Sequence, residues 1–264
     1  MPKVAVGGQT EVSAPACDKS LRVHLDLHAP SAYLNSQAQV EGMDADMAYQ
    51  ILTRAGCKVS WHLQPMTGAR IIRSLQDGHF DVMIRASNTP ERQQYAYFST
   101  PYRQEVVGVF SLKESGLEPF LTLDSALAQK LRLIGPASGW YGEYFEQLRK
   151  RWRESGLYTS YPDAAKATEL LFATPSRGEL VLVDADIFFH HLGRERHHLV
   201  QLMKDRLMVT PAHLMLRKNA VEAEDLLAIN QAIQDLREEG VLAGLENRYR
   251  PVPLQQMLQT RKDD

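Results

Sequence analysis

The chain has 264 residues, which allows one large domain or two small lobes, each with its own core. Its 32 acidic and 30 basic residues leave a formal net charge of −2. This balance, with no long block of lysine and arginine, argues against a nucleic-acid partner. No apolar run approaches the roughly 20 residues that a membrane-spanning helix needs.

Residues 1–16 are rich in glycine, serine, threonine and proline, and they lack the apolar stretch of a signal peptide. We expect them to form a flexible leader. If the protein is exported, its signal peptide is not among these residues.

The chain between residues 21 and 84 alternates between strand and helix patterns. Strand patterns cover 21–27, 58–63 and 80–84, and helical spacing covers 43–55 and 68–76. The run 80–84 is almost entirely apolar, as is typical of a strand buried in a parallel sheet. The alternation predicts a wound α/β layer.

A second wound unit follows an extended segment at 105–112. It has strand patterns at 131–134 and 178–183 and helical patterns at 138–152, at 163–174 and from Asp186 onward. A second extended segment, 208–216, leads into an amphipathic helix at 223–239. The two extended segments predict a two-strand hinge between lobe 1 (17–107 and 212–264) and lobe 2 (108–211).

The chain has two cysteines, Cys17 before the first predicted strand and Cys57 after the first predicted helix. A strand start and a helix end lie at the same edge of the sheet in a βα unit, so we expect a disulfide. It would close a loop of about 40 residues, stabilise the fold by roughly 4 kcal/mol and indicate an oxidising compartment. The alternative is two unrelated buried thiols.

Small polar residues follow the buried strand at 80–84, and Thr89-Pro90-Glu91 is a typical helix start. Arg92 would lie in the first turn of that helix, where the helix dipole disfavours a cation unless an anion binds there. Its guanidinium could hold a carboxylate, with Ser87 and Thr89 as further donors. The alternative is an ordinary structural helix start.

Four motifs occur in the order and spacing of one family: residues 42–46 (Gly-Met-Asp-Ala-Asp), 75–81, 89–92 (Thr-Pro-Glu-Arg) and 97–102. With them, residues 21–250 resemble the family 3 extracellular solute-binding proteins, which serve polar amino acid ABC importers. The resemblance implies a two-lobed, type II periplasmic-binding-protein-like α/β fold. It also implies that Arg92 clamps the carboxylate of the ligand.

In the second lobe, the resemblance places a ligand-binding turn at Ser138 and an ammonium-binding acid at Asp186, with Asp184 as a close competitor. It also places an aromatic wall at Tyr33, which Trp140 could complete from the other side. Either aromatic could instead pack between the lobes.

Arg85 stands where amino acid binders of this family usually have a small residue. An extra cation would suit a ligand with a second anionic group. The alternative is a structural arginine that pairs with Asp81 or Glu105.

The histidine doublets at 190–191 and 197–198, with Glu195 between them, have the spacing of metal ligands on a helix. Gly193 interrupts that helix, and Arg194 and Arg196 would repel a cation, so we expect a solvated surface, no metal and no cofactor.

The resulting prediction is a periplasmic, monomeric, non-enzymatic protein that captures an amino acid or another carboxylate in the interlobe cleft for a membrane permease. One alternative is a ligand-sensing module of a signalling receptor. Another is an enzyme similar to cyclohexadienyl dehydratases, which would turn over prephenate or arogenate. Its candidate acid–base residues would be His213, Glu105 and Asp186.

Overall fold

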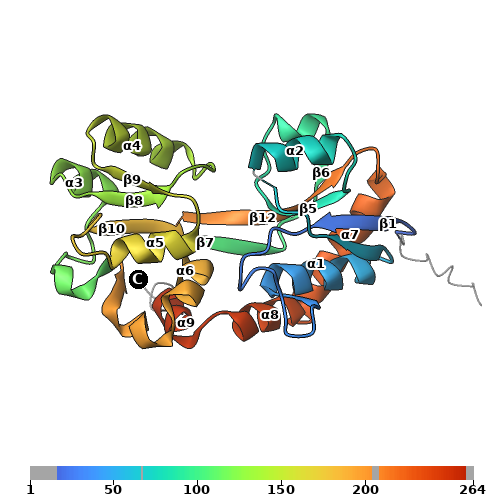
Figure 1. Cartoon of the computed structure of the whole chain (residues 1–264). Coiled ribbons are helices and arrows are strands. Elements are labelled where there is room, and N and C mark those ends of the chain that lie inside the picture. The colour runs from blue at the N-terminus through green and yellow to red at the C-terminus, as the bar shows by residue number, and fades with distance from the viewer. Residues whose placement is uncertain (1–16, 67, 204–207, 260–264) are drawn as a thin grey trace, which may run out of the picture.

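The structure is a computed structural model that describes residues 17–66, 68–203 and 208–259 (Figure 1). The leader predicted at 1–16 lies outside these residues. Within them, no helix combines the length and the apolar character needed to cross a membrane.

The strands alternate with helices along most of the chain, as the sequence predicts. The strands are β1 (Ser20–His24), β2 (Tyr33–Leu34), β3 (Val40–Glu41), β4 (Lys58–His62), β5 (Val82–Ala86), β6 (Ala96–Phe98), β7 (Arg103–Leu112), β8 (Leu133–Pro136), β9 (Tyr158–Tyr161), β10 (Leu180–Asp184), β11 (Val200–Leu202) and β12 (Met208–Arg217). The α-helices are α1 (Met43–Arg54), α2 (Gly68–Gln76), α3 (Leu123–Ala128), α4 (Glu143–Glu154), α5 (Ala164–Leu171), α6 (Ala185–Leu192), α7 (Ala223–Glu238), α8 (Val241–Tyr249) and α9 (Val252–Gln259). Short 3-10 helices are η1 (Arg92–Gln94), η2 (Lys113–Ser115) and η3 (Arg194–Leu199).

One mixed sheet runs through the whole molecule in the order β4-β1-β5-β12-β7-β10-β8-β9. The first lobe holds parallel β1, β4 and β5, and the second holds parallel β8, β9 and β10. The long strands β7 and β12 pair antiparallel with each other between them. β12 continues along β5 of the first lobe, and β7 continues along β10 of the second. The two predicted crossings are therefore present and form one antiparallel pair.

The strand β10 is buried on both faces, because its side chains alternate between two cores of the second lobe. Val181 and Val183 pack with Phe188 of α6, while Leu182 packs with Trp152 of α4. This explains the continuous apolar run in the sequence.

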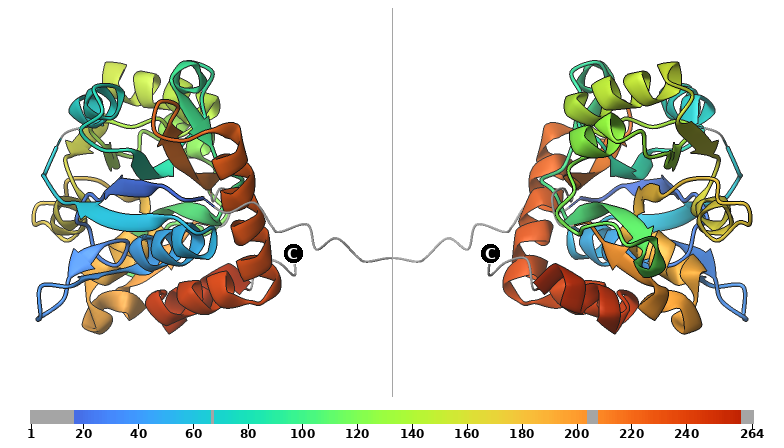
Figure 2. Two further views of the ribbon diagram at one scale, coloured as in Figure 1. Left: turned by 90° about the vertical axis from the view of Figure 1, so that its right-hand side faces the viewer. Right: turned by 90° about the vertical axis from the view of Figure 1, so that its left-hand side faces the viewer.

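In the first lobe, α7 and α8 pack against α1, and Figure 2 shows them in orange and red along one side of the molecule. The next helix, α9, buries Leu254 in the core of the second lobe. The sequence analysis assigned residues 212–264 to lobe 1, whereas Leu254 of α9 packs in the second lobe. The exact lobe boundaries stay a prediction.

Two predicted helices differ from the structure. The helix expected at 138–152 begins only at Glu143, because Gly139 and Gly142 adopt positive φ angles of 96° and 92°, outside the helical region. The helix expected after Thr89 is only the short η1, because the chain must reach Ala96 and pair with β12 as β6. The shortness of η1 removes the helix dipole from the argument for Arg92.

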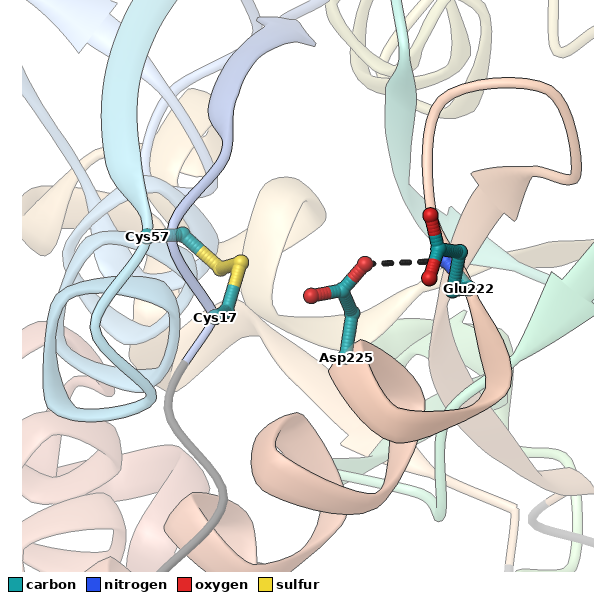
Figure 3. The surroundings of a disulfide bond; sticks show 4 residues. All are labelled: Cys17, Cys57, Glu222 and Asp225. Carbon is teal, nitrogen blue, oxygen red and sulfur yellow. Dashed lines mark hydrogen bonds between the residues drawn. A yellow bond between two sulfur atoms is a disulfide. The ribbon is translucent and has the colours of Figure 1, made fainter.

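The predicted disulfide between Cys17 and Cys57 is confirmed (Figure 3). The Cα atoms lie 4.9 Å apart, where the entry to β1 meets the end of α1. Beside it, the Asp225 carboxylate of α7 accepts a 2.9 Å hydrogen bond from the backbone N–H of Glu222. The disulfide therefore joins the first strand to the first helix next to a capped end of α7.

Candidate functional site

The two lobes are joined by a cluster of ion pairs around Arg85, at the carboxyl end of β5. Its Nε donates to Glu105 at 2.5 Å, and its Nη2 donates to Asp184 at 2.8 Å. Asp184 ends β10 in the second lobe, and Glu105 lies on β7 between the lobes. The carboxyl ends of the central strands of both lobes therefore meet at this arginine, and ligands of open α/β sheets bind at such ends.

A β-bulge directs Arg85 toward the second lobe. Met215 of β12 pairs with Met83 of β5, but His213 pairs with Ala86, so β5 has one extra residue between these pairs. Arg85 itself has a φ of 55°, an uncommon angle for a residue with a side chain. Such bulges turn a side chain out of its regular position at the end of a strand.

Of the two acids that the sequence analysis named as possible partners of Arg85, only one pairs with it. Glu105 pairs with it, whereas Asp81 is taken by Arg22 at 2.9 Å and by Arg217 at 2.8 Å. The sequence left open whether Arg85 contacts a ligand or has a structural role. The structure shows it bridging the lobes, and a contact with ligand stays a prediction.

A second, fully buried ion pair lies behind this cluster. Asp44, at the start of α1, accepts hydrogen bonds from Arg103 at 2.6 and 2.8 Å, from Tyr102 at 2.7 Å and from Ser31 at 2.6 Å. Burial alone would raise the pKa of Asp44, but Arg103, with help from Arg85, holds it at about 2. Asp44 therefore remains ionised and anchors the hinge strand β7 to α1.

The two acids at the end of β10 have different partners. Asp184 caps α6 through a 3.0 Å hydrogen bond from the N–H of Ile187 and also meets Arg85. Asp186, only 2% exposed, accepts hydrogen bonds from Nε and Nη2 of Arg250 at 2.8 and 2.9 Å. Burial, reinforced by Asp186 and Glu105, raises the pKa of Asp184 to about 6 against the attraction of Arg85. Asp184 therefore belongs to the Arg85 cluster, whereas Asp186 pairs with Arg250 at the C-terminal end of α8. Contact of either acid with a ligand stays a prediction.

Arg92 lies beside the end of β5. Its Nη1 donates to the backbone carbonyl of Ser87 at 3.1 Å, and its backbone N–H lies 3.4 Å from Thr89 Oγ1. Among the described residues, no carboxylate pairs with Arg92. The three residues predicted to bind a carboxylate are thus held together in one loop, and their contact with ligand stays a prediction.

In the described part of the chain, the contacts of the other predicted ligand residues do not involve Arg85, Glu105 or Asp184. Tyr33 donates to Glu41 at 3.3 Å within the β2–β3 hairpin. Ser138 and Trp140 lie in the exposed loop before α4, and Trp140 is 59% exposed. Their ligand contacts also stay a prediction.

The sequence analysis missed several residues of this region. Burial raises the pKa of Tyr141 to about 12, and the nearby charges of Asp184 and Arg85 also act on its hydroxyl. The aromatic group beside the cluster is therefore Tyr141, next to the predicted Trp140. Asp44 and Arg103 were also missed, although an acid among the apolar residues of 43–48 signals a buried carboxylate that needs a cation.

Two of the histidines that the sequence singled out lie within hydrogen-bond distance of backbone carbonyls. His197 lies 3.0 Å from the carbonyl of Phe189, and His213 Nδ1 lies 2.7 Å from the carbonyl of Ser99. Within the described ranges, no three His, Cys, Asp or Glu side chains gather as metal ligands do.

The bridge made by Arg85 leads to a first prediction. Replacing Arg85 by glutamine removes the cation from between Glu105 and Asp184, and their mutual repulsion should then favour separated lobes. We expect the unliganded variant to have a larger radius of gyration than the wild type in small-angle scattering. The control is Arg132→Gln, whose partner Glu179 lies in the same lobe. An unchanged radius in Arg85→Gln would contradict the bridge.

Comparisons with known proteins agree with this architecture. The profile of the bacterial extracellular solute-binding proteins, family 3, matches residues 21–252. A search of curated proteins finds no match.

Several solved structures share the fold. An ancestral arginine-binding protein bound to arginine is 22% identical, with a TM-score of 0.66 over 88% of this chain and 98% of that one. A histidine kinase sensor domain with similarity to periplasmic binding proteins is 16% identical (TM-score 0.67; 89% and 99% covered). An ancestral amino acid-binding protein described as a precursor of cyclohexadienyl dehydratase is 20% identical (TM-score 0.66; 88% and 96% covered).

These structures confirm the two-lobed, type II periplasmic-binding-protein fold. Because the family profile spans most of the chain, the protein belongs to the bacterial extracellular solute-binding proteins of family 3.

Proposed function

We propose that this protein works in the periplasm, where it captures an amino acid or a related small carboxylate between its lobes and delivers it to the permease of an ABC importer. The observation that carries the proposal is the meeting of strand ends from both lobes at Arg85 and Asp184, with Arg92 beside them. The family and its arginine-binding relative support a ligand of this class. We further propose that the protein acts as a monomer without a cofactor.

The charges at these strand ends suit a zwitterion. Arg92 offers a guanidinium that no described carboxylate pairs with, and this geometry suits a ligand carboxylate. Ser87 and Thr89 can add donors from the same loop. Asp184 offers a carboxylate to a ligand ammonium, in competition with Arg85.

Closure of the lobes would complete the binding site. Ser138 and Trp140 lie on the second lobe and Arg92 on the first, so closure around a ligand would bring the predicted residues of both lobes to it. The antiparallel pair β7 and β12 is the continuous connection about which such a movement can occur.

The first experiment is a thermal-shift screen of the purified protein against amino acids, dicarboxylates and amines. A ligand present at 100 times its dissociation constant stabilises the folded state by about 2.7 kcal/mol. The carboxylate ligand that this screen identifies then serves in calorimetry with the variants of Arg92.

Arg92→Ala should weaken binding of that ligand by about 2 to 5 kcal/mol, or roughly 30-fold to several thousandfold, because a charge-assisted bidentate pair loses its cation. Arg92→Lys should recover only part of the affinity. The control is Arg73→Ala, whose side chain is 83% exposed and should leave affinity unchanged. An Arg92→Ala protein that binds within about threefold of the wild type would refute this role.

Two relatives favour specific alternatives, a sensor domain and a precursor of a dehydratase. The enzyme alternative is tested by incubating the protein with prephenate and arogenate and following product formation. We expect no turnover, because His213 is bonded to a backbone carbonyl and Glu105 is paired with Arg85. Product that disappears in a Glu105→Gln variant would establish the enzyme instead.

A further inference from the structure

A cavity of about 1140 Å³ lies between the second lobe and the segment that leads from α8 of the first lobe into α9. One part of its lining comes from the end of α6 and from η3, and another from residues 247–253 and 255–257, where α8 leads into α9. Figure 1 shows α9 close to α6 and following α8. Lys113, at the end of β7, completes the lining. None of Arg85, Asp184 or Arg92 lines this cavity, so it is distinct from the proposed amino acid site.

The lining of this cavity is positively charged. Lys113, Arg194, Arg248 and Arg250 all contribute, and no aspartate or glutamate lines it. This is unexpected in a chain whose acidic residues outnumber the basic ones, 32 to 30. His190 of α6 and His198 of η3, from the doublets noted in the sequence, line the cavity on the same part as Arg194.

Three of these four cations have no carboxylate partner among the described residues. Arg250 is the exception, because Asp186 and Glu246 neutralise it. Arg248 lies over the ring of Tyr249, with its guanidinium carbon 5.3 Å from the ring centroid. The net charge of the lining is therefore positive, carried by Lys113, Arg194 and Arg248.

Like charges gathered in one concavity repel each other and concentrate a positive potential there. A bound anion relieves this repulsion, and arginine is suited to phosphate and carboxylate oxygens because of its planar fork of donors. The volume of about 1140 Å³ is slightly above the roughly 300–1,000 Å³ of most small-molecule sites, so a small molecule fits. Several anionic groups on one ligand would be needed to meet cations on both parts of the lining.

We propose that this cavity is a second ligand site, for a small molecule that carries at least two phosphate or carboxylate groups. Arg194 on one part of the lining and Arg248 on the other bind opposite ends of the ligand, and Lys113 adds a third positive charge. The site is independent of the amino acid site and does not rest on the proposed transport function.

The test is calorimetry of the full chain with inorganic pyrophosphate and, separately, with citrate at low ionic strength. We expect one equivalent of at least one of these anions to bind, with affinity reduced at least about tenfold in the Arg194→Gln/Arg248→Gln double variant. The control double variant, Arg73→Gln/Lys150→Gln, removes the same charge from side chains that are 83% and 77% exposed elsewhere. It should bind as the wild type does.

Three results with the wild type and the double variants would overturn the proposal, and a fourth concerns Arg92. The three are the absence of binding of both probes at millimolar concentration, equal losses in the two double variants, and wild-type affinity in Arg194→Gln/Arg248→Gln. Equal losses would mean that net charge alone attracts the anions. Arg92→Ala should bind the probe as the wild type does, and a loss in that variant would place the anion at the interlobe site and also overturn the proposal.

Discussion

Asp44→Asn should destabilise the protein by about 3 to 5 kcal/mol, one of the largest effects expected of a single substitution in this chain. The substitution keeps the shape of the side chain but removes its charge, which leaves Arg103, with a side chain only 2% exposed, without its bidentate partner. Tyr102 and Ser31 also lose a charged acceptor. Urea unfolding monitored by circular dichroism measures the loss.

The pH dependence provides an independent check. The pKa of Asp44 is lowered from 3.8 to about 2, so its contribution is fully present above about pH 4 and is lost as the pH falls toward 2. Wild-type stability should therefore decline through this range, and Asp44→Asn should lack that part of the decline.

Asp46→Asn is the matched control, because Asp46 lies in the same turn of α1 but contacts the hydroxyl of Tyr249 rather than a cation. It should cost about 1 kcal/mol. In the double variant Asp44→Asn/Arg103→Gln, the loss should be smaller than the sum of the single losses, because neither charge is left alone. A loss below about 1 kcal/mol in Asp44→Asn would contradict a structural role for this pair.

Removal of the disulfide should lower the free energy of unfolding by about 4 kcal/mol, because Cys17 and Cys57 close a loop with a sequence separation of 40. Both residues are buried, at 1% and 3% exposure, so little solvent reaches the bond in the folded state. We expect reductant to act mainly on unfolded or partly unfolded molecules.

The measurement is urea unfolding of the wild type with and without dithiothreitol, beside a Cys17→Ala/Cys57→Ala variant. The variant should be less stable than the oxidised wild type, about as stable as the reduced wild type, and unaffected by reductant. Labelling of the unreduced, denatured wild type should detect no free thiol. Two reactive thiols, or wild-type stability that reductant leaves unchanged, would contradict the prediction.

Local patterns were sufficient to predict most of the fold. The helix predicted at 68–76 matches α2, and the buried strands and both long crossings were found from their apolar periodicity. The elements that were missed are the short strands β2, β3, β6, β9 and β11 and the helices α3, α8 and α9. β9 has only four residues, of which Tyr161 alone is buried, and this is too short a stretch for an apolar periodicity to be recognised.

The candidate site was predicted less completely, because its geometry depends on contacts between distant segments. The sequence drew attention to Arg85 and, as a competitor of Asp186, to Asp184, but the 2.8 Å contact between Arg85 and Asp184 depends on a bulge in β5 and on how the lobes meet. The pairing of Asp186 with Arg250 likewise requires α8 to lie beside α6. No local pattern reports such a contact.

The interleaved order of strands also has a consequence for synthesis of the chain on the ribosome. β5 of the first lobe has β12 as its antiparallel neighbour, and α1 packs against α7, so the first lobe needs segments that are translated last. The second lobe is continuous from β7 to β11 and then lacks α9 and the part of β12 that pairs with β7. A nascent chain that has reached Leu202 can therefore complete most of its second lobe while β5 still lacks its neighbour β12. The first lobe, whose synthesis begins first, is thus completed last.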